Sequence, residues 1–452
     1  MDFNAVLNKI KPSKGEEEEM NSFTARLLEA AKKLKANAMI CGSIEKGTWL
    51  AHKKEVDLFL LFKPSLPKKQ LEKKGLELAK KIVKVLKGRF VIAYAEHPYL
   101  RGKIGKFQVD IVPCYDVPDP EKIKSAVDRT PYHVKFVKGN LKNPDDVRLL
   151  KQFCVANKCY GADLKTQGFS GYICELLIIK YGSFLNLAKE AAKWRAGHFI
   201  SFYEMNKEEA WKRFKAPLIV IDPVDKNRNV AAAISTESFY RFVKACNDFL
   251  KKPSKELFLK QEDEPYTLKE IARKFEERGT RWYLINFKRP DVLDDILYPQ
   301  MRRCVKAIDK MLEQNGFKVL RSSFFCNKEC VLVYEMEIWH IPKVFKNVGP
   351  DIYSKHAEQF LKHYKEKKVF VEGEKWVVET EREFTTALDF FKDLLKRQEK
   401  ELLEKGIPSK IAPLMKGCKI CGDDDALKAI KKLPEDFRSF LREWFEKDLN
   451  VV

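Results

Sequence analysis

The sequence predicts a multidomain protein of the α+β class. Its 452 residues are too many for one compact core, so roughly two to four domains are expected. Strand-like and helix-like segments alternate over about the first 115 residues, the middle of the chain is mostly helical, and the alternation returns after Pro253. These shifts predict three domains, which cover residues 1–140, 141–258 and 259–452.

The first domain is predicted to hold a small mixed sheet with helices on one side. Residues Asn21–Ala36 and Lys68–Lys87 place apolar side chains at helical spacing. Short apolar runs predict strands at Ala38–Ser43, Val56–Phe62, Arg89–Leu100 and Phe107–Tyr115. The turn RGKIGK has two glycines and precedes the last run, so the last two strands are expected to form a hairpin.

The central and carboxy-terminal parts differ in pattern. From about residue 120 to 258 helical segments dominate, and one short predicted strand, Ala216–Val224, interrupts them. Further on, RWYLINFKRP, VLRSSFF and Cys330–Trp339 predict strands, Val292–Asn315 predicts a helix, and about the last 65 residues are expected to be helical. The pattern favours a helical central domain followed by an α+β body and tail.

The charge balance points to a polyanionic partner. Lysine and arginine number 86 against 65 aspartates and glutamates, which gives a formal net charge of +21 and a pI of about 9.3. An excess of this size is typical of proteins that bind nucleic acid. A highly charged surface of the thermophile kind is the alternative, but that pattern usually adds glutamate in step with lysine.

The sequence gives no sign of export or of membrane insertion. The amino terminus lacks the apolar core of a signal peptide, and the apolar run VDLFLLF is far too short to span a bilayer. The eleven cysteines follow no disulfide spacing and are expected to be reduced thiols of a cytoplasmic protein. Cys418 and Cys421 form a CxxC without a second pair at metal spacing, since Cys326 and Cys330 have another spacing, so a zinc site there is left open.

Three acidic residues in apolar strands suggest a metal site. Glu55 and Asp57 lie two residues apart, so both project from one face of a strand while the apolar residues around them face the core. Carboxylates this close repel each other unless a cation lies between them, and Mg²⁺ prefers oxygen ligands. Asp110 alternates in the same way in a later strand. If the two strands are neighbours, the three carboxylates predict a two-metal phosphoryl-transfer site; exposed acids on a solvated sheet face are the alternative.

A glycine–serine turn precedes these acids. Gly42 and Ser43 end a short strand, where backbone N–H groups and a hydroxyl can face a phosphate. Lys46 lies three residues further on and can reach the same phosphate. Together with the E-x-D that follows it, the turn predicts a phosphate-binding site beside the metal site.

The order G-S-x-x-x-x-T-x-L, then E-x-D, then a third acid resembles the nucleotidyltransferase superfamily of DNA polymerase beta. Longer blocks are similar to the archaeal, class I CCA-adding enzymes, and the likeness runs from about residue 20 to 345. The blocks include Ala95–Tyr99, Val109–Tyr115, Ile123–His133, Val147–Lys151, Gly168–Ile178, Asp222–Ala232 and Asp291–Gln300. The resemblance implies a nucleotidyltransferase head in the first domain, and a tRNA nucleotidyltransferase that adds C, C and A to the 3′ end of tRNA without a nucleic-acid template.

The resemblance also implies roles for individual residues. Glu55, Asp57 and Asp110 match the family's metal carboxylates, which would hold two Mg²⁺ ions, and Ser43 matches its phosphate-binding serine. Lys46 stands where the family often has arginine, so its bidentate phosphate geometry is lost. The remaining matches are expected near the nucleotide: His133, Lys151 and Tyr160 at the triphosphate and sugar, Arg228 near the base, and Tyr94, Glu96 and His97 close by.

The implied reaction uses CTP and ATP. The tRNA 3′ hydroxyl, activated by Mg²⁺ and Asp110, attacks the α-phosphate and pyrophosphate leaves; the same reaction repairs a damaged CCA end. The basic surface would bind the acceptor and T arms of tRNA, and the family likeness favours a homodimer. Alternatives are a poly(A)-type or other RNA 3′-terminal nucleotidyltransferase, an RNA-binding protein without catalysis, and a small-molecule nucleotidyltransferase. Ser170, in GFSG, is interpreted as a helix start and not as a nucleophile.

Overall fold

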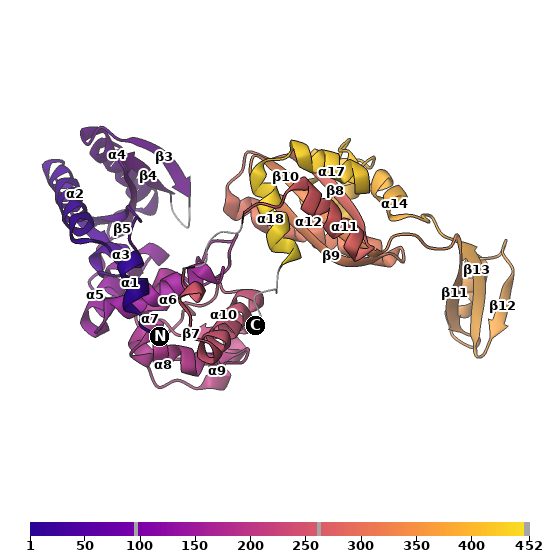
Figure 1. Ribbon diagram of the computed structural model, residues 1–452, viewed down its shortest axis with the longest axis horizontal. Coiled ribbons are helices and arrows are strands. Elements are labelled where there is room, and N and C mark those ends of the chain that lie inside the picture. Colours follow the sequence, from indigo (N-terminus) through magenta and orange to yellow (C-terminus); the bar gives the residue numbers. More distant parts are fainter. Residues whose placement is uncertain (95–97, 260–263, 447–452) are drawn as a thin grey trace. The chain divides into compact units, whose positions relative to one another are not determined.

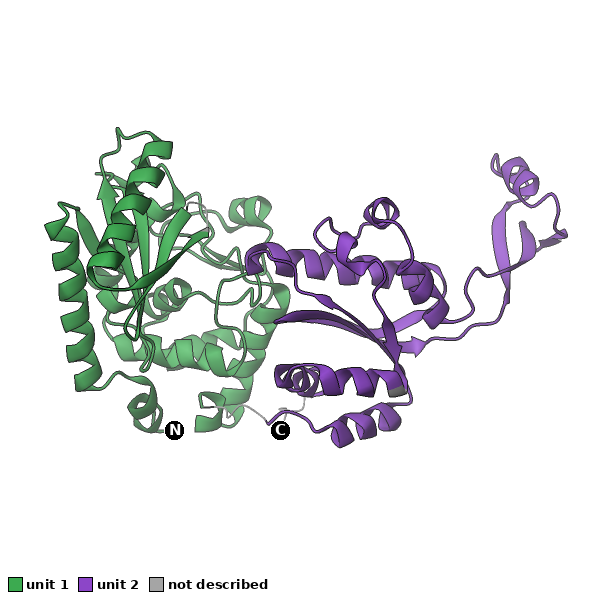
Figure 2. Cartoon of the chain, turned by 90° about the horizontal axis from the view of Figure 1, so that it is seen from above, with its two compact units in different colours: residues 1–261 green, residues 262–452 purple. Residues whose placement is uncertain are grey.

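The computed structural model describes residues 1–94, 98–259 and 264–446. The chain forms two compact units, Met1–Gln261 and Glu262–Val452 (Figure 2). The α+β class is confirmed. The predicted boundary between a head and a helical domain at residue 140 stays a prediction, because both parts lie inside the first unit.

A five-stranded mixed sheet forms the amino-terminal part of the first unit (Figure 1). Its strands are β1 (Ala38–Cys41), β2 (Glu55–Phe62), β3 (Arg89–Tyr94), β4 (Pro98–Ile104) and β5 (Phe107–Tyr115). They lie in the order β1-β2-β5-β4-β3, and β2 and β5 are parallel while the other neighbours are antiparallel. The predicted hairpin is therefore present as β4 and β5.

One strand prediction was wrong. The run predicted as a single strand, Arg89–Leu100, is two antiparallel strands, which pair from Arg89 opposite Lys103 to Tyr94 opposite Pro98. The sequence between them carries two polar residues followed by a proline. Apolar residues continue on both sides of residues 95–97, which lie outside the described residues, and this made the two strands look like one.

Helices cover one face of this sheet. The helix α2 (Lys14–Lys33) begins at Ser13, which forms a reciprocal capping box with Glu16. Its apolar stripe and that of α4 (Lys68–Val85) bury the side chains that alternate inward from the strands; the shared core includes Val56, Leu58, Leu60, Val109 and Ile111. Each fully buried aliphatic side chain contributes roughly 1.5–3 kcal/mol. The intervening residues of β2 and β5 must face the opposite side of the sheet.

The rest of the first unit is mostly helical. Its helices are α1 (Asn4–Ile10), α5 (Thr130–Asn140), α6 (Pro144–Ala156), α7 (Gly171–Tyr181), α8 (Phe184–Ala191), α9 (Lys207–Phe214) and α10 (Thr236–Lys251), with the short parallel pair β6 (His198–Ile200) and β7 (Leu218–Val220). Ser170 caps α7, since its hydroxyl accepts from the N–H of Ile173 at 3.2 Å. The predicted helix start at Ser170 is confirmed.

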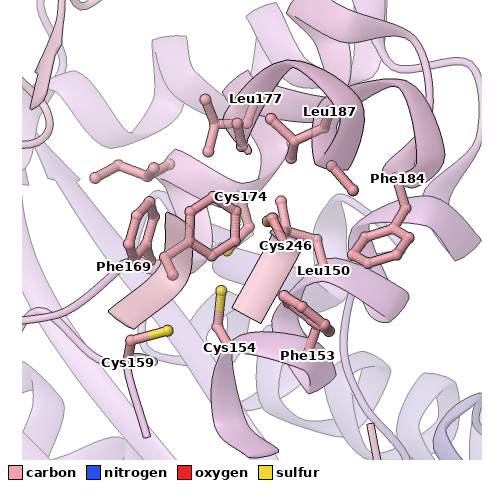
Figure 3. Packing of buried hydrophobic residues seen from close by; sticks show 14 of the residues in the cluster. Leu150, Phe153, Cys154, Cys159, Phe169, Cys174, Leu177, Phe184, Leu187 and Cys246 are labelled. Atoms are coloured by element: carbon pink, nitrogen blue, oxygen red, sulfur yellow. The ribbon is translucent and has the colours of Figure 1, made fainter. Parts of the chain in front are cut away.

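Aromatic rings and thiols fill the core of these helices (Figure 3). Phe153, Phe169 and Phe184 are fully buried among leucines. Four buried cysteines lie in the same cluster: Cys154, Cys159, Cys174 and Cys246. Burial raises the pKa of the Cys154 thiol. The expectation of reduced cysteines agrees with this apolar packing, which gives thiols no reason to ionise.

The second unit contains a four-stranded sheet of order β14-β8-β10-β9. Its strands are β8 (Arg281–Lys288), β9 (Lys318–Cys326), β10 (Glu329–Ile338) and β14 (Ile420–Gly422). Helices pack on both faces of the sheet. One core contains α12 (Asp294–Gln314), α14 (Ala387–Leu394), α15 (Glu399–Glu404) and α16 (Ala412–Met415). The other core contains α11 (Leu268–Arg278), α17 (Asp423–Lys432) and α18 (Glu435–Phe445). The sheet is thus buried on both faces.

The second unit also contains a three-stranded sheet. It has the order β11-β13-β12, with β11 (Val344–Asp351), β12 (Val369–Glu372), β13 (Lys375–Glu381) and the helix α13 (Ala357–His363). The end of the chain is not wholly helical as predicted, because Cys421 lies in β14, which adds to β8 as an edge strand. Among the described residues, no helix is long and apolar enough to cross a membrane.

Candidate active site

The parallel pairing of β2 and β5 brings the predicted carboxylates together. Asp57 lies directly opposite Asp110, and Glu55 opposite Gln108. The condition on which the prediction depended, that the two strands are neighbours, is met. Burial, followed by the negative charges of Asp110 and Glu55, raises the pKa of Asp57 to about 6. The site therefore has more negative charge than its surroundings compensate.

An arginine neutralises one of these acids. The Arg101 guanidinium donates to both carboxylate oxygens of Asp110, at 2.9 Å from Nε and 2.8 Å from Nη2. Arg101 lies opposite Asp110 across β4 and β5. Within the described ranges, no three His, Cys, Asp or Glu side chains are grouped closely enough to hold a metal ion. The oxygen-only donors and the raised pKa of Asp57 fit Mg²⁺, and both oxygens of Asp110 accept from Arg101 in this structure.

The glycine of the predicted turn lies against the central acid. Gly42 opens the short helix α3 (Gly42–Glu45) with φ +68°, and a Cβ atom there would lie 1.8 Å from Oδ2 of Asp57. Ser43 follows it, half-buried, and its carbonyl accepts from the N–H of Thr48 at 2.8 Å. Only glycine lets the turn approach the carboxylate this closely.

Replacing Gly42 by alanine is expected to reduce activity by at least about 10²-fold, because the added Cβ must push the Asp57 carboxylate out of place. The matched control is Gly47→Ala. Gly47 has nearly the same φ, +66°, but nothing lies within 4 Å of its would-be Cβ. Both variants should lose about 1 kcal/mol of stability from backbone strain, and steady-state kinetics should separate them. Equal kinetic losses would show that contact with Asp57 has no importance.

The two predicted phosphate-binding lysines meet on one buried glutamate. Glu175, fully buried in α7, accepts hydrogen bonds from Nζ of Lys46 and, at 2.6 Å, from the hydroxyl of Thr48. Nζ of Lys151 lies 3.5 Å from the same carboxylate and donates to the Thr48 carbonyl and hydroxyl at 3.0 Å. Burial would raise the pKa of Glu175, but the two lysines outweigh it and hold that pKa low. Two cations against one anion leave a surplus positive charge.

Tyr160 belongs to this lysine cluster. A Cβ on Gly171 would meet the Tyr160 hydroxyl at 3.3 Å and Cε of Lys151 at 3.4 Å, so both side chains lie over the first residue of α7. Burial raises the pKa of the Tyr160 hydroxyl, which therefore remains a neutral donor. Lys46, Lys151 and Tyr160 are thus close together, as the prediction of a shared role requires.

A second cluster collects around Asp222. Nε2 of His133 lies 2.9 Å and Nη1 of Arg228 lies 2.7 Å from the same oxygen of this fully buried carboxylate. The Tyr172 hydroxyl donates to its other oxygen at 3.3 Å, and the Tyr172 ring stacks on His133 with centroids 4.0 Å apart. Burial lowers the pKa of His133 in spite of Asp222, so the imidazole is neutral at pH 7.

The two clusters are linked, since Nζ of Lys46 lies 5.5 Å from the Tyr172 ring centroid. Several residues of this arrangement were not predicted: Thr48, Arg101, Tyr172, Glu175 and Asp222. A signal existed for Glu175, which is the one acid in the apolar helix GYICELLII. Tyr94 ends β3, but its side chain and the predicted residues Glu96 and His97 lie outside what the structure describes.

The pKa of Asp57 predicts how stability depends on pH when metal is absent. The folded-state pKa, about 6, exceeds the unfolded value of 3.8, so the stabilisation from this group is complete below about pH 4 and lost as pH rises through 6. In EDTA, wild type should lose roughly 2–3 kcal/mol relative to Asp57→Asn between about pH 4 and about pH 7. Chemical denaturation at both pH values measures this, and a constant difference between the two proteins would contradict it.

The acids on neighbouring strands, with the turn that touches them, define the class of protein. The model of the nucleotidyltransferase domain matches residues 24–133, which contain all three carboxylates and the turn. A solved structure of a cytoplasmic RNA terminal U-transferase is a distant match, with TM-score 0.45 and 16% identity over 56% of this chain and 96% of that one. A likeness this slight carries no argument about substrate. The first unit holds a nucleotidyltransferase domain.

Further matches are more specific. The family models described as tRNA nucleotidyltransferase, second domain, and CCA-adding enzyme, C-terminal domain, match residues 145–259 and 278–412. A CCA-adding enzyme of Methanocaldococcus jannaschii is 41% identical over 86% of this chain and 89% of its own length. One from Methanothermobacter thermautotrophicus is 35% identical over 98% of both chains. The chain belongs to the family of CCA-adding enzymes.

Proposed function

We propose that this chain adds C, C and A to the 3′ end of tRNA from CTP and ATP, with release of pyrophosphate, and that it repairs damaged CCA ends by the same reaction. The observation that carries the proposal is the pairing of Asp57 with Asp110 beside the Gly42 turn. It supports the proposal because paired carboxylates next to a close-lying glycine turn suit nucleotidyl transfer, in a chain of this family.

Three carboxylates form the reacting centre in this proposal. Glu55 and Asp57 of β2 and Asp110 of β5 would hold two Mg²⁺ ions, which when bound stabilise charge on the attacking and leaving oxygens. Asp110 is the candidate to accept the proton of the RNA 3′ hydroxyl, because it lies directly opposite Asp57 on the neighbouring strand. Gly42 lets the neighbouring turn lie close to the Asp57 carboxylate, because it has no Cβ.

The lysine cluster is proposed to bind the triphosphate. Lys46, Lys151 and the Tyr160 hydroxyl present hydrogen-bond donors. The surplus positive charge of the two lysines favours the triphosphate, whose two outer phosphates leave as pyrophosphate. Ser43 would add its hydroxyl. His133 and Arg228, held by Asp222, are proposed to position the sugar and base, with Tyr94, Glu96 and His97 nearby.

Wider partners belong to the same proposal. We propose that the basic surface, with a net charge of +21 over the chain, binds the acceptor and T arms of tRNA through phosphates in the cytoplasm. The predicted homodimer can be checked by light scattering, which should give twice the 52.7 kDa chain mass.

The nearest alternative is an RNA 3′-terminal nucleotidyltransferase of the poly(A) type. Product length separates the two. A tRNA transcript that ends before CCA, incubated with both CTP and ATP in excess, should grow by three residues and stop. A ladder of longer products would favour the alternative instead.

A further inference from the structure

A basic hollow lies on the open face of the sheet, beside the carboxylates. It has a volume of about 400 Å³ and is lined by residues of β3, β4 and β5, among them Arg89, Val91, Arg101, Lys103 and Gln108. None of its lining residues is acidic. The proposed reaction gives the hollow no role, although one of its lining residues, Arg101, contacts Asp110.

The strand register fixes which face of the sheet the hollow occupies. Arg101 pairs with Asp110 and Lys103 with Gln108, so these side chains share the face of the carboxylates. In β3, Arg89 lies opposite Lys103 and Val91 opposite Arg101, which adds both to the same face. The alternate residues, including Leu100 and Ile104, are buried against the helices on the other side.

Two of the hollow's cations are available for a ligand. Arg101 is held by Asp110, and a further lining lysine, Lys106, is paired with Glu19. Arg89 and Lys103 are exposed and form no ion pair with any residue that the structure describes. Val91 beside them is 62% exposed, on a strand at the edge of the sheet. The hollow thus offers positive charge and an open side.

The strand order places the hollow opposite the proposed triphosphate site. Lys46 and Ser43 follow β1, at one edge of the sheet, while β4 and β3 lie at the other edge, with the acids of β2 and β5 between them. In an in-line displacement the attacking oxygen approaches from the side opposite the leaving pyrophosphate. The RNA 3′ end must therefore arrive over β4 and β3.

We propose that this hollow binds the phosphodiester backbone of the RNA strand that ends in the reacting 3′ hydroxyl, with Arg89 and Lys103 contacting its last phosphates. The inference rests on the proposed function, because it takes the RNA end as the attacking group. Arg101 then serves as a positioning residue, which can pass from Asp110 to an RNA phosphate when the acceptor strand enters.

The test compares two double variants of the full chain. Arg89→Ala/Lys103→Ala removes the two available cations of the hollow. Lys81→Ala/Lys84→Ala removes two exposed lysines of α4, the helix that covers the opposite face of the sheet. Filter binding of a tRNA transcript that ends before CCA, without nucleotide and at several KCl concentrations, gives the affinity and its salt dependence.

We expect the hollow variant to bind this RNA about tenfold more weakly, with a log–log salt slope smaller by about two, since each lost phosphate contact removes about 0.9. Its KM for CTP at saturating RNA should stay within about twofold of wild type. The α4 variant should bind like wild type. Unchanged RNA binding in the hollow variant, or an equal loss in the α4 variant, would overturn the proposal.

A modified RNA identifies the strand. Neutral methylphosphonates at the last two linkages should weaken binding to wild type but add little to the defect of the hollow variant. Fully additive losses would mean that the hollow contacts another part of the RNA, and would refute the assignment. If wild type extended no tRNA at all, the proposed function itself would fall, whereas normal extension with an unaffected hollow variant would remove only this inference.

Discussion

Replacement of Asp57 by asparagine is expected to reduce CTP incorporation by at least about 10³-fold without lowering the stability of the protein at neutral pH. Asp57 is the central acid of the three, and a neutral amide cannot hold a divalent cation as a carboxylate does, which removes several kcal/mol of transition-state stabilisation. The fold should benefit, because the repulsion and burial that raise the pKa of Asp57 to about 6 disappear. Single-turnover kinetics and denaturant unfolding measure the two effects.

The matched control for this variant is Asp116→Asn. Asp116 is an exposed acid directly after the end of β5, outside the paired register of the two strands. Asp116→Asn should change neither the rate nor the stability by much, since an exposed polar substitution usually changes the free energy of unfolding by less than about 0.5 kcal/mol. A near-normal rate in Asp57→Asn would show that the carboxylates do not take part in the reaction.

Glu175→Gln is expected to have the largest effect on stability, a loss of roughly 3–5 kcal/mol. The variant leaves Lys46 and Lys151, whose side chains are only 8% and 3% exposed, without their shared anion. Two uncompensated charges away from water are costly to keep. The free energy of unfolding from urea denaturation tests this, and the KM for CTP should rise because the lysines lose their positions.

Two further variants test this interpretation, one as a control and one as a partial rescue of stability. Glu237→Gln breaks an exposed pair with Arg241 and should cost less than about 1 kcal/mol. Adding Lys46→Met to Glu175→Gln removes one of the stranded charges and should recover part of the stability, but not the affinity for CTP. Unaltered stability in Glu175→Gln would mean that the glutamate does not hold the lysines.

The carboxylates could be predicted from sequence because strand alternation is a local rule. Glu55 and Asp57 share a face at a spacing of two, and Asp110 repeats the pattern. What the rule could not supply was the neighbour relation of β2 and β5, which are separated by α4, β3 and β4. Parallel pairing of this kind depends on the whole sheet. The sequence could therefore state it only as a condition, and the structure shows that β2 and β5 are neighbours.

The contacts of the lysines lay beyond local patterns. Lys46 and Lys151 were predicted to face a triphosphate, but the structure shows that both are held by Glu175, which is 129 residues from Lys46 in sequence. No periodicity connects residues that far apart. The same limit applies to Arg101 on Asp110, since a strand arginine is most simply a solvated side chain until the register is known.

Stepwise addition tests the central claim most directly. Three transcripts of one tRNA, which end before CCA, after the first C and after both C residues, are each given labelled CTP alone or ATP alone. The account predicts that CTP adds two residues, one and none respectively, and that ATP adds one residue to the third transcript only. Addition of ATP to the first transcript, or of CTP beyond two residues, would contradict it.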